Sequence, residues 1–268
     1  MIKFQYMLAP VEDFTDNAFR TLCYRHGVDL TFTELLRTEA LANNIENTWS
    51  RIEKKDNTPV AIQLLGSSEK YLEKFLEMFK PFEGFKGFNL NLGCPDPQIV
   101  SLGYGCAMVK KVPIVKNLVN MIKRKEYSCS IKMRLGKNIY DKQKKVYLNL
   151  INEVDADFFV IHARHGRENY DKKPDYSIFE ECCNTGKIII ANGDIDSKEK
   201  VEILKSSGVK GVMIGRGAIN NPQIFNFLKG NKLISSEEIK KEYNELAEKY
   251  NAPFRYRKNV MKRMFSLP

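Results

Sequence analysis

Short apolar segments recur along the chain, and a longer amphipathic segment separates each one from the next. The apolar segments are four to six residues long and rich in Val, Ile, Leu and Phe, which is typical of buried β-strands. They predict eight strands, at residues 4–9, 30–33, 60–64, 88–91, 130–133, 158–162, 188–191 and 211–214.

The amphipathic segments predict helices between these strands. Ser68 precedes apolar residues spaced three and four apart, as an N-cap residue precedes a helix. Asp196 is expected to begin another helix, with Glu199 in its first turn. Eight strand–helix units over about 225 residues predict a (β/α)8 TIM barrel rather than a doubly wound sheet, and no GxGxxG motif follows the first strand.

The pattern changes after Phe227. Ser235 and Glu238 have the spacing of a capping box, and apolar residues then follow at helical intervals until Asn251-Ala252-Pro253. We therefore expect an α/β barrel domain at residues 1–230 and a small C-terminal helical domain at residues 231–268.

Positive charge is concentrated in two parts of the chain, whose net charge is +10. Residues 110–145 contain twelve Lys or Arg but only two acids, and residues 251–268 contain five basic residues and no acid. Clustered cations favour a polyanion such as nucleic acid, and Phe254 and Tyr256 stand among them where bases could stack. A solvated lysine-rich surface is the alternative.

The cysteines and the amino-terminal segment indicate the cellular compartment in which the protein is expected. Six cysteines occur without a CxxC pair, so we expect reduced thiols, no disulfide framework and no metal site. No apolar run approaches the roughly 20 residues that span a membrane, and the first residues lack the pattern of a signal peptide. The expected location is cytoplasmic, with no membrane partner.

In a barrel the functional residues lie at the carboxyl ends of the strands. The seventh predicted strand ends in Asn192-Gly193-Asp194, and the eighth ends in Gly215-Arg216 before a helix. Glycines there let backbone N–H groups approach a phosphate, and an arginine adds a charge-assisted hydrogen bond. Tight turns without a ligand are the alternative for these glycines.

Three further side chains are candidates for the same site. An inward Lys132 would stabilise negative charge on a reduced planar ring, or form a Schiff base, or extend along the strand end to solvent. Gln63 offers a donor and an acceptor that suit the imide edge of a flavin, or serves as a structural amide. His162 is expected to contact a ligand, because Arg164 and His165 crowd the same strand end, and a packed core histidine is the alternative.

Cys94 follows an alternating apolar run in the segment FNLNLGCP, between Gly93 and Pro95. A cysteine at the carboxyl end of a strand is either a small buried apolar residue or a thiol that faces a pocket and does chemistry. Its local sequence leaves both alternatives open.

The motifs together resemble those of the tRNA-dihydrouridine synthase family. The resemblance extends from Leu8 to about Phe227, and the motifs occur in the order of that family. They read LAPVEDFTDNAFR, AIQLLG, NLGCPDPQIVSLGYGCAMVKK, IKMRLG, VIHARHGRENY, IIANGDI and GVMIGRGAINNPQIF.

The resemblance implies an FMN-dependent oxidoreductase that uses NADPH, or NADH, to reduce the C5=C6 bond of specific uridines in tRNA. Hydride would pass from flavin N5 to C6, and Cys94 would protonate C5 from the opposite face. A thiol with an ordinary pKa of roughly 8.5 is mostly protonated at neutral pH and still able to give up its proton. The helical domain would grip tRNA, and a monomer is expected.

The resemblance also implies a set of site residues. The residues expected to bind FMN are Ala9, Pro10, Val11, Gln63, Lys132, His162, Asn192, Gly193, Asp194, Gly215 and Arg216. Those expected near the substrate are Asn91, Arg164, Tyr170, Arg257 and Lys258. Two positions depart from the family pattern: Val11 stands where methionine is usual, and Asn259 stands where a histidine often follows the Arg-Lys pair.

Two other functions are compatible with parts of the same sequence pattern. A small-molecule FMN oxidoreductase of the dihydroorotate dehydrogenase type would use the same phosphate site and Lys132, but it has no need of the basic C-terminal residues. An RNA-binding protein without turnover would need the basic residues but neither Cys94 nor Lys132.

Overall fold

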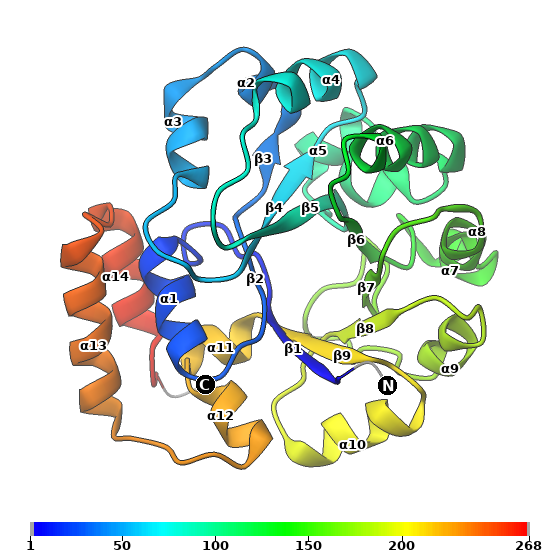
Figure 1. Ribbon diagram of the computed structural model, residues 1–268. Coiled ribbons are helices and arrows are strands. Elements are labelled where there is room, and N and C mark those ends of the chain that lie inside the picture. The colour runs from blue at the N-terminus through cyan, green and yellow to red at the C-terminus, as the bar shows by residue number, and fades with distance from the viewer. Residues whose placement is uncertain (1–2, 267–268) are drawn as a thin grey trace.

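The computed structural model describes residues 3–266, whose strands form a parallel ring surrounded by helices (Figure 1). The hydrogen-bonded strand order is β1-β9-β8-β7-β6-β5-β4-β2, and the short β3 pairs only with β4. The strand bounds are β1 Gln5–Leu8, β2 Thr31–Phe32, β3 Leu36–Arg37, β4 Val60–Leu65, β5 Phe85–Leu92, β6 Cys129–Arg134, β7 Phe159–His162, β8 Ile189–Asn192 and β9 Gly211–Ile214. The eight predicted strands and the (β/α)8 fold are therefore confirmed.

Two kinds of pairing close the ring at β1. On one side β1 pairs with β9 over four residues, from Gln5↔Gly211 to Leu8↔Ile214. On the other side β1 meets the start of β2 at the bridge Met7↔Leu30, where the N–H of Leu8 donates to the carbonyl of Leu30 at 3.0 Å. Closure brings the carboxyl ends of all these parallel strands to one end of the barrel.

Helices lie outside the ring and follow the strands in chain order (Figure 1). Their bounds are α1 Asn17–Arg25, α2 Thr38–Ala42, α3 Glu46–Trp49, α4 Glu69–Met78, α5 Pro97–Ser101, α6 Val112–Arg124, α7 Ile139–Gln143, α8 Val146–Glu153, α9 Ile178–Cys183, α10 Lys198–Ser206, α11 Arg216–Asn220, α12 Ile224–Lys229, α13 Ser236–Lys249 and α14 Phe254–Arg263. Short 3-10 turns occur at η1 Ser50–Ile52 and η2 Gly105–Met108.

Most of the predicted helix starts are correct. Ser68 caps α4 by accepting from the N–H of Tyr71, and Ser235 with Glu238 forms the expected capping box of α13. The expectation for Asp196 was wrong, because Ser197 caps α10 and Asp196 instead pairs with Lys200 at 2.7 Å. Ser197 has the extended backbone that an N-cap residue needs, and its hydroxyl reaches the N–H of Lys200.

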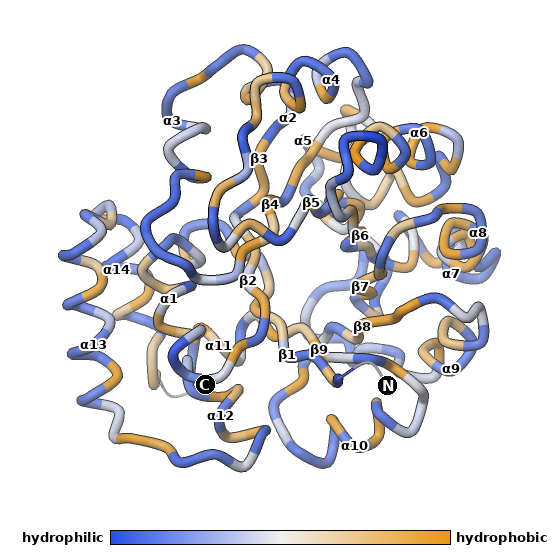
Figure 2. Tube along the Cα trace, viewed as in Figure 1, coloured by the Kyte–Doolittle hydropathy of each residue, from blue (hydrophilic) through white to orange (hydrophobic). Residues whose placement is uncertain are grey.

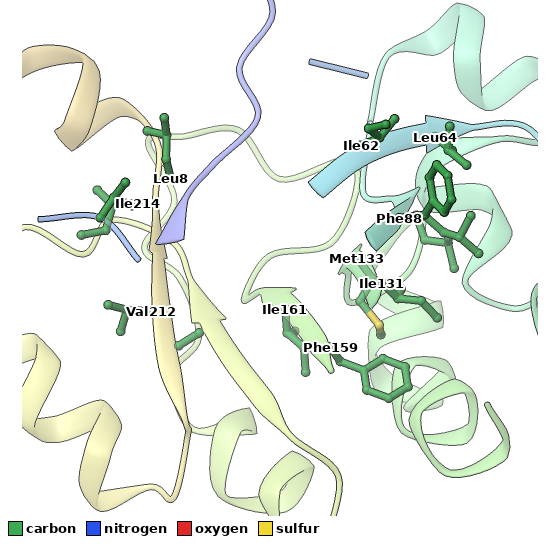
Figure 3. Close-up of a cluster of buried hydrophobic side chains, with 14 of the residues drawn as sticks. Leu8, Ile62, Leu64, Phe88, Ile131, Met133, Phe159, Ile161, Val212 and Ile214 are labelled. Carbon is green, nitrogen blue, oxygen red and sulfur yellow. The ribbon is translucent and has the colours of Figure 1, made fainter. Parts of the chain in front are cut away.

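Apolar side chains fill two regions, one between strands and helices and one inside the ring. The outer core includes Leu8, Ile62, Phe88, Ile131, Phe159 and Val212, several of which Figure 3 draws between the strands and the helices. The inner core consists of Met7, Ala9, Phe32, Ala61, Val160, Ile190 and Met213. Figure 2 shows the resulting pattern, with apolar positions along the strands and hydrophilic positions on the outer turns of the helices. The alternation along each strand therefore separates the two cores.

The two C-terminal helices pack on one flank of the barrel, beside α1 (Figure 1). Glu242 of α13 pairs with Arg25 at 2.9 Å and with His26 at 2.7 Å, and Tyr243 packs edge-on against Phe19. Gly230 ends α12 with a left-handed backbone. The division into two domains itself stays a prediction, and its end residues 1, 2, 267 and 268 lie outside the described residues.

Glu34, just after β2, connects α14 to the loop after β1. Its buried carboxylate accepts hydrogen bonds from the hydroxyl of Tyr256 and from the N–H of Asp13, and Arg51 lies 3.6 Å away. Asp13 in turn pairs with Arg255 of α14. Burial raises the pKa of Glu34 to about 7, although the hydrogen bond from Tyr256 and the charge of Arg51 act in the opposite direction.

In the part of the chain from residue 3 to residue 266, no helix is both long enough and apolar enough to span a membrane.

Replacement of Glu34 by Gln is expected to flatten the dependence of stability on pH. A carboxyl group whose pKa is raised from 4.5 to about 7 on folding binds its proton more tightly in the folded chain, so the free energy of unfolding falls as the pH rises through that window. Between about pH 5 and about pH 8, the free energy of unfolding of the parent should fall by up to about 2 kcal/mol more than that of Glu34→Gln. Urea unfolding at a series of pH values measures both.

Glu83→Gln is the matched control, because this carboxylate is largely exposed and should keep the parent's pH profile. If stability depends on pH in the same way in the parent and in Glu34→Gln, the pKa of Glu34 is not raised by folding.

Candidate active site

A cavity of about 1030 Å³ opens at the carboxyl ends of the barrel strands. Its wall includes ten of the eleven residues predicted to bind a cofactor: Ala9, Pro10, Val11, Lys132, His162, Asn192, Gly193, Asp194, Gly215 and Arg216. Tyr170, predicted near the substrate, also lines it. Gln63, Asn91, Cys94 and Arg164 are not part of this wall, and Arg257 and Lys258 lie on α14.

The ends of β8 and β9 bring backbone close to the cavity. Gly193 has a φ of +128°, and a Cβ there would lie 3.1 Å from atoms of His162 and Pro174. Gly215 precedes α11, and a Cβ there would lie 3.3 Å from the Cβ of Ala9. Only a residue without a side chain leaves this strip of backbone open, which is what a phosphate group requires.

Asp194 holds two arginines at the edge of the cavity. Its carboxylate pairs with Arg164 at 2.5 Å on the buried side and with Arg216 on the exposed side. Burial raises the pKa of Asp194, but the hydrogen bond and charge of Arg164 and the charge of Arg216 outweigh it, so the pKa lies below its ordinary value. The group is therefore a carboxylate at neutral pH, and it orients Arg216 rather than binding an anion itself.

Arg164 is completely buried beneath the cavity wall. Besides Asp194, its guanidinium contacts Nε2 of His162 at 3.1 Å and the carbonyls of Lys172 and Tyr170. These bonds hold the loop after β7 against the end of β8. In this position Arg164 supports the residues that line the cavity, whereas Tyr170 faces the cavity and lies 3.9 Å from the guanidinium of Arg216.

His162 and Lys132 face the cavity in different protonation states. Burial, followed by the positive charges of Lys132, Arg134, Arg164 and Arg216, lowers the pKa of His162 to about 2, so the ring is neutral. Burial and the charge of Arg134 lower the pKa of Lys132 to about 8, so most of its amine is still protonated at neutral pH. A protonated amine favours the electrostatic role of Lys132 over a Schiff base, which requires the neutral form.

A chain of buried amides supports the loop that carries Cys94. Asn91 accepts from the N–H groups of Gly93 and Cys94 at 3.0 and 2.9 Å, and its own amide donates to Gln63 at 2.8 Å. Gln63 donates in turn to Asn89 at 2.7 Å. Both ends of the Gln63 amide thus have protein partners, and Asn91 fixes the backbone of Cys94.

The Cys94 loop is also held from the other side. The N–H of Cys106 donates to the carbonyl of Cys94 at 3.0 Å. Gly105 has a φ of +56°, and a Cβ there would lie 2.3 Å from the same carbonyl oxygen. Any residue larger than glycine at this position would therefore displace the loop.

The thiol of Cys94 is partly buried, and this burial raises its pKa. The charges of Lys132 and Arg134 act in the opposite direction but do not reverse the shift. The group is consequently a protonated thiol at neutral pH, a form that can donate a proton but is a weak nucleophile.

Arg134 is a site residue that the sequence-based set omitted. It is buried, donates to the carbonyls of His165 and Glu168 at 2.8 and 3.1 Å, and influences the pKa values of Cys94, Lys132 and His162. Its position in the sequence could have indicated this role. Arg134 follows Lys132 by two residues in β6, so both side chains lie on the same face of the strand.

The basic C-terminal residues are only partly available to a ligand. Arg257 donates to the carbonyls of Ala252 and Ala247 at 2.9 and 2.7 Å, so it stabilises the end of α13, whereas Lys258 is exposed. The expectation that Tyr256 offers a surface for base stacking was wrong, because its ring is buried and its hydroxyl donates to Glu34. Phe254 is 79% exposed.

Within residues 3–266, no cluster of three or more His, Cys, Asp or Glu side chains is placed to hold a metal ion.

Comparison with known protein families gives one match, which extends over almost the whole chain. The family described as "Dihydrouridine synthase (Dus)" matches residues 7–266. A probable tRNA-dihydrouridine synthase of Helicobacter pylori (strain ATCC 700392 / 26695) is 30% identical over 266 residues, which cover 94% of this chain and 80% of the relative. One of Staphylococcus aureus (strain COL) is 30% identical over 232 residues, which cover 82% of this chain and 70% of the relative.

Among solved structures, morphinone reductase in complex with tetrahydroNAD matches with a TM-score of 0.55 at 11% identity, covering 89% of this chain and 90% of its own. A variant of NCR from Zymomonas mobilis matches with a TM-score of 0.53 at 13% identity, covering 92% of this chain and 93% of its own. At these identities the likeness shows a common barrel fold.

Replacement of Arg164 by Leu is expected to lower the free energy of unfolding by about 3 kcal/mol, because Asp194 loses its buried partner and the carbonyls of Lys172 and Tyr170 lose their donor. Arg167→Leu, in the same loop but exposed, should change it by less than about 0.5 kcal/mol. Urea unfolding measures both values, and equal effects for the two variants would argue against a supporting role for Arg164.

Proposed function

Because the chain belongs to the dihydrouridine synthase family, we propose that it is an oxidoreductase that reduces the C5=C6 bond of uridines in tRNA with a bound FMN. The observation that carries the proposal is the joint placement of Lys132, Cys94 and two glycine-containing strand ends around one end of the barrel. The relatives named as tRNA-dihydrouridine synthases support tRNA, rather than a small pyrimidine, as the substrate.

The residues of the cavity fit FMN. The open backbone at Gly193 and Gly215 and the guanidinium of Arg216 suit a phosphate group. Ala9, Pro10 and Val11 supply an apolar wall for a flat ring, and Lys132 and His162 face the same space with one positive charge and one neutral ring. When bound, a flavin supplies the hydride that C6 of the uracil accepts.

Cys94 is the proposed proton donor for C5. As the S–H bond breaks, the proton joins C5 and leaves a thiolate, which solvent then reprotonates. The raised pKa of the thiol keeps the proton available at neutral pH, and the positive charges of Lys132 and Arg134 stabilise the thiolate that forms. Asn91 positions this donor by holding the backbone of Cys94 and stands beside the proposed uracil site.

We further propose that residues 1–230 form the catalytic domain and residues 231–268 the tRNA-binding domain. Exposed Lys258 and Phe254 suit a phosphate and a base, and Arg257 contributes by stabilising the end of α13. The remaining parts of the proposal are NADPH, or NADH, as reductant, a cytoplasmic location and a monomeric state.

The test of the proposed function uses purified protein, NADPH and tRNA transcribed without modifications. Mass spectrometry of the digested tRNA should show uridines that have gained two hydrogen atoms, and the protein as purified should absorb blue light as flavoproteins do. Colourless protein that leaves every uridine unchanged after reconstitution with FMN would overturn the proposal.

Cys94→Ala is expected to slow uridine reduction at least about 100-fold, because the proton donor is lost. Its flavin content and the rate at which NADPH reduces the flavin should stay at the parent values. Cys183→Ala, which removes another partly exposed thiol far along the chain, is the matched control. Full activity of Cys94→Ala would show that the assignment of the acid is wrong.

The rate of uridine reduction should fall as the pH rises through about 8, where Lys132 loses its charge. The raised pKa of Cys94 places the loss of the thiol proton at higher pH. In Lys132→Arg the charge persists, since the guanidinium pKa exceeds about 12, and the decline should move to higher pH. Single-turnover rates between about pH 7 and about pH 9 test this, and an unchanged profile in Lys132→Arg would exclude Lys132 as its cause.

A further inference from the structure

The lysine-rich segment at residues 110–145 is distributed over both ends of the barrel. Arg124 and Lys125 end α6 just before β6, so they lie at the end away from the cavity. Lys137 and Lys144 come after β6, at the end where the cavity opens. The proposed catalytic chemistry uses none of these four residues.

Five exposed or partly exposed residues near the cavity form a surface that we call the rim patch: Lys137, Ile139, Tyr140, Lys144 and Arg167. Tyr140 is 70% exposed and Ile139 is 43% exposed, and they are consecutive residues at the start of α7. Contiguous exposed apolar surface is a feature of interaction sites, whereas a single exposed apolar residue needs no explanation.

The rim patch adjoins the loop that carries Cys94. The N–H of Gly166 donates to the carbonyl of Gly136 at 2.9 Å, which joins the loops after β6 and β7. A Cβ on Gly166 would lie 2.5 Å from Sγ of Cys106 and 2.8 Å from the carbonyl oxygen of Lys137, so these two loops also touch the segment around Cys106. That segment binds the carbonyl of Cys94 directly.

The backbone that presents Tyr140 is firmly held. The side chain of Asn138 caps α7 at 3.0 Å, and the carboxylate of Asp141 accepts the N–H of Lys137 at 2.8 Å. Lys142 pairs with Asp175 at 2.8 Å, and the left-handed backbone of Lys145 separates α7 from α8. The exposed tyrosine is therefore presented by an ordered turn.

The rim patch carries cations without acidic partners. Over the described residues, Lys137, Lys144 and Arg167 take part in no ion pair, whereas their neighbours Lys142 and Lys145 pair with Asp175 and Glu181. The nearby carboxylates are also engaged, since Asp141 accepts from Lys137 N–H and Glu168 from His165 N–H. Unpaired cations around an exposed aromatic ring suit single-stranded nucleic acid, whose phosphates and bases they contact respectively.

We propose that the rim patch is a second RNA-binding surface, which holds the nucleotides flanking the target uridine. Tyr140 stacks on an unpaired base, and Lys137, Lys144 and Arg167 contact the adjoining phosphates. This inference rests on the proposed function. α7 lies across the barrel from α13 and α14 (Figure 1), so an RNA that contacts both surfaces spans the opening of the cavity and brings its uridine to Cys94.

The experiment measures the binding of an unmodified tRNA transcript to the flavin-loaded protein over a range of salt concentrations. Tyr140→Ala should weaken binding at least about five-fold, and Tyr140→Phe should retain the parent affinity because the ring still stacks. Lys144→Glu and Arg167→Glu should each weaken binding and reduce the slope of log affinity against log salt by about one. Lys125→Glu makes the same charge change at the opposite end of the barrel and should leave binding unchanged.

A second measurement separates the rim patch from the chemistry. The rate at which NADPH reduces the flavin in the absence of tRNA should be the same in every variant. The inference is overturned if the triple variant Tyr140→Ala/Lys144→Glu/Arg167→Glu binds the transcript within about two-fold of a parent that itself binds and reduces tRNA. A parent that neither binds nor reduces tRNA would overturn the proposed function, and the rim patch with it.

Discussion

The pairing of β1 with β9 is the constraint on which the rest of the structure depends. This pairing, with the bridge from Met7 to Leu30, turns an open parallel sheet into a ring. Ala9, at the end of β1, then lies beside Gly215, at the end of β9, although about 200 residues separate them in the chain. Without closure, the first and last strands would be opposite edges of a sheet, and no single cavity would collect their ends.

Closure has an electrostatic consequence, because it gathers several cationic side chains at one end of the barrel. Burial, followed by the positive charges of Lys132, Arg134 and Arg164, lowers the pKa of His162, so that ring stays neutral. The charges of Lys132 and Arg134 also partly offset the effect of burial on the pKa of Cys94, without ionising its thiol. The carboxylate of Asp194 is the nearby compensating charge, and it sits between Arg164 and Arg216. The barrel thus places one neutral ring, one protonated thiol and one lysine with a lowered pKa at the carboxyl ends of its strands.

The strands could be predicted from the apolar runs, and the wall residues after the seventh and eighth predicted strands from the glycines and polar residues that end those runs. Ala9, Pro10 and Val11, which are apolar, were indicated only by the resemblance to the family. Other features depend on contacts that local patterns do not encode. β3 has only two residues and pairs through β4 alone, and Tyr256 looks like an exposed aromatic residue until α14 packs and turns its hydroxyl to Glu34. The roles of Arg257 and Gln63 likewise follow from partners that are distant in sequence or in neighbouring strands, so their residue types alone did not reveal them.

The central claim is that Cys94 protonates C5 on the face of the uracil opposite to the one that receives hydride at C6. A single turnover in deuterium oxide tests it, with the flavin reduced and equilibrated with the solvent before unmodified tRNA is added. The N5 hydrogen of a reduced flavin and the thiol hydrogen both exchange with solvent, so both carbons acquire deuterium. NMR of the isolated nucleoside gives the relative configuration of the two labels. Protonation by Cys94 from the opposite face gives a trans arrangement at C5 and C6, and a cis arrangement would exclude it.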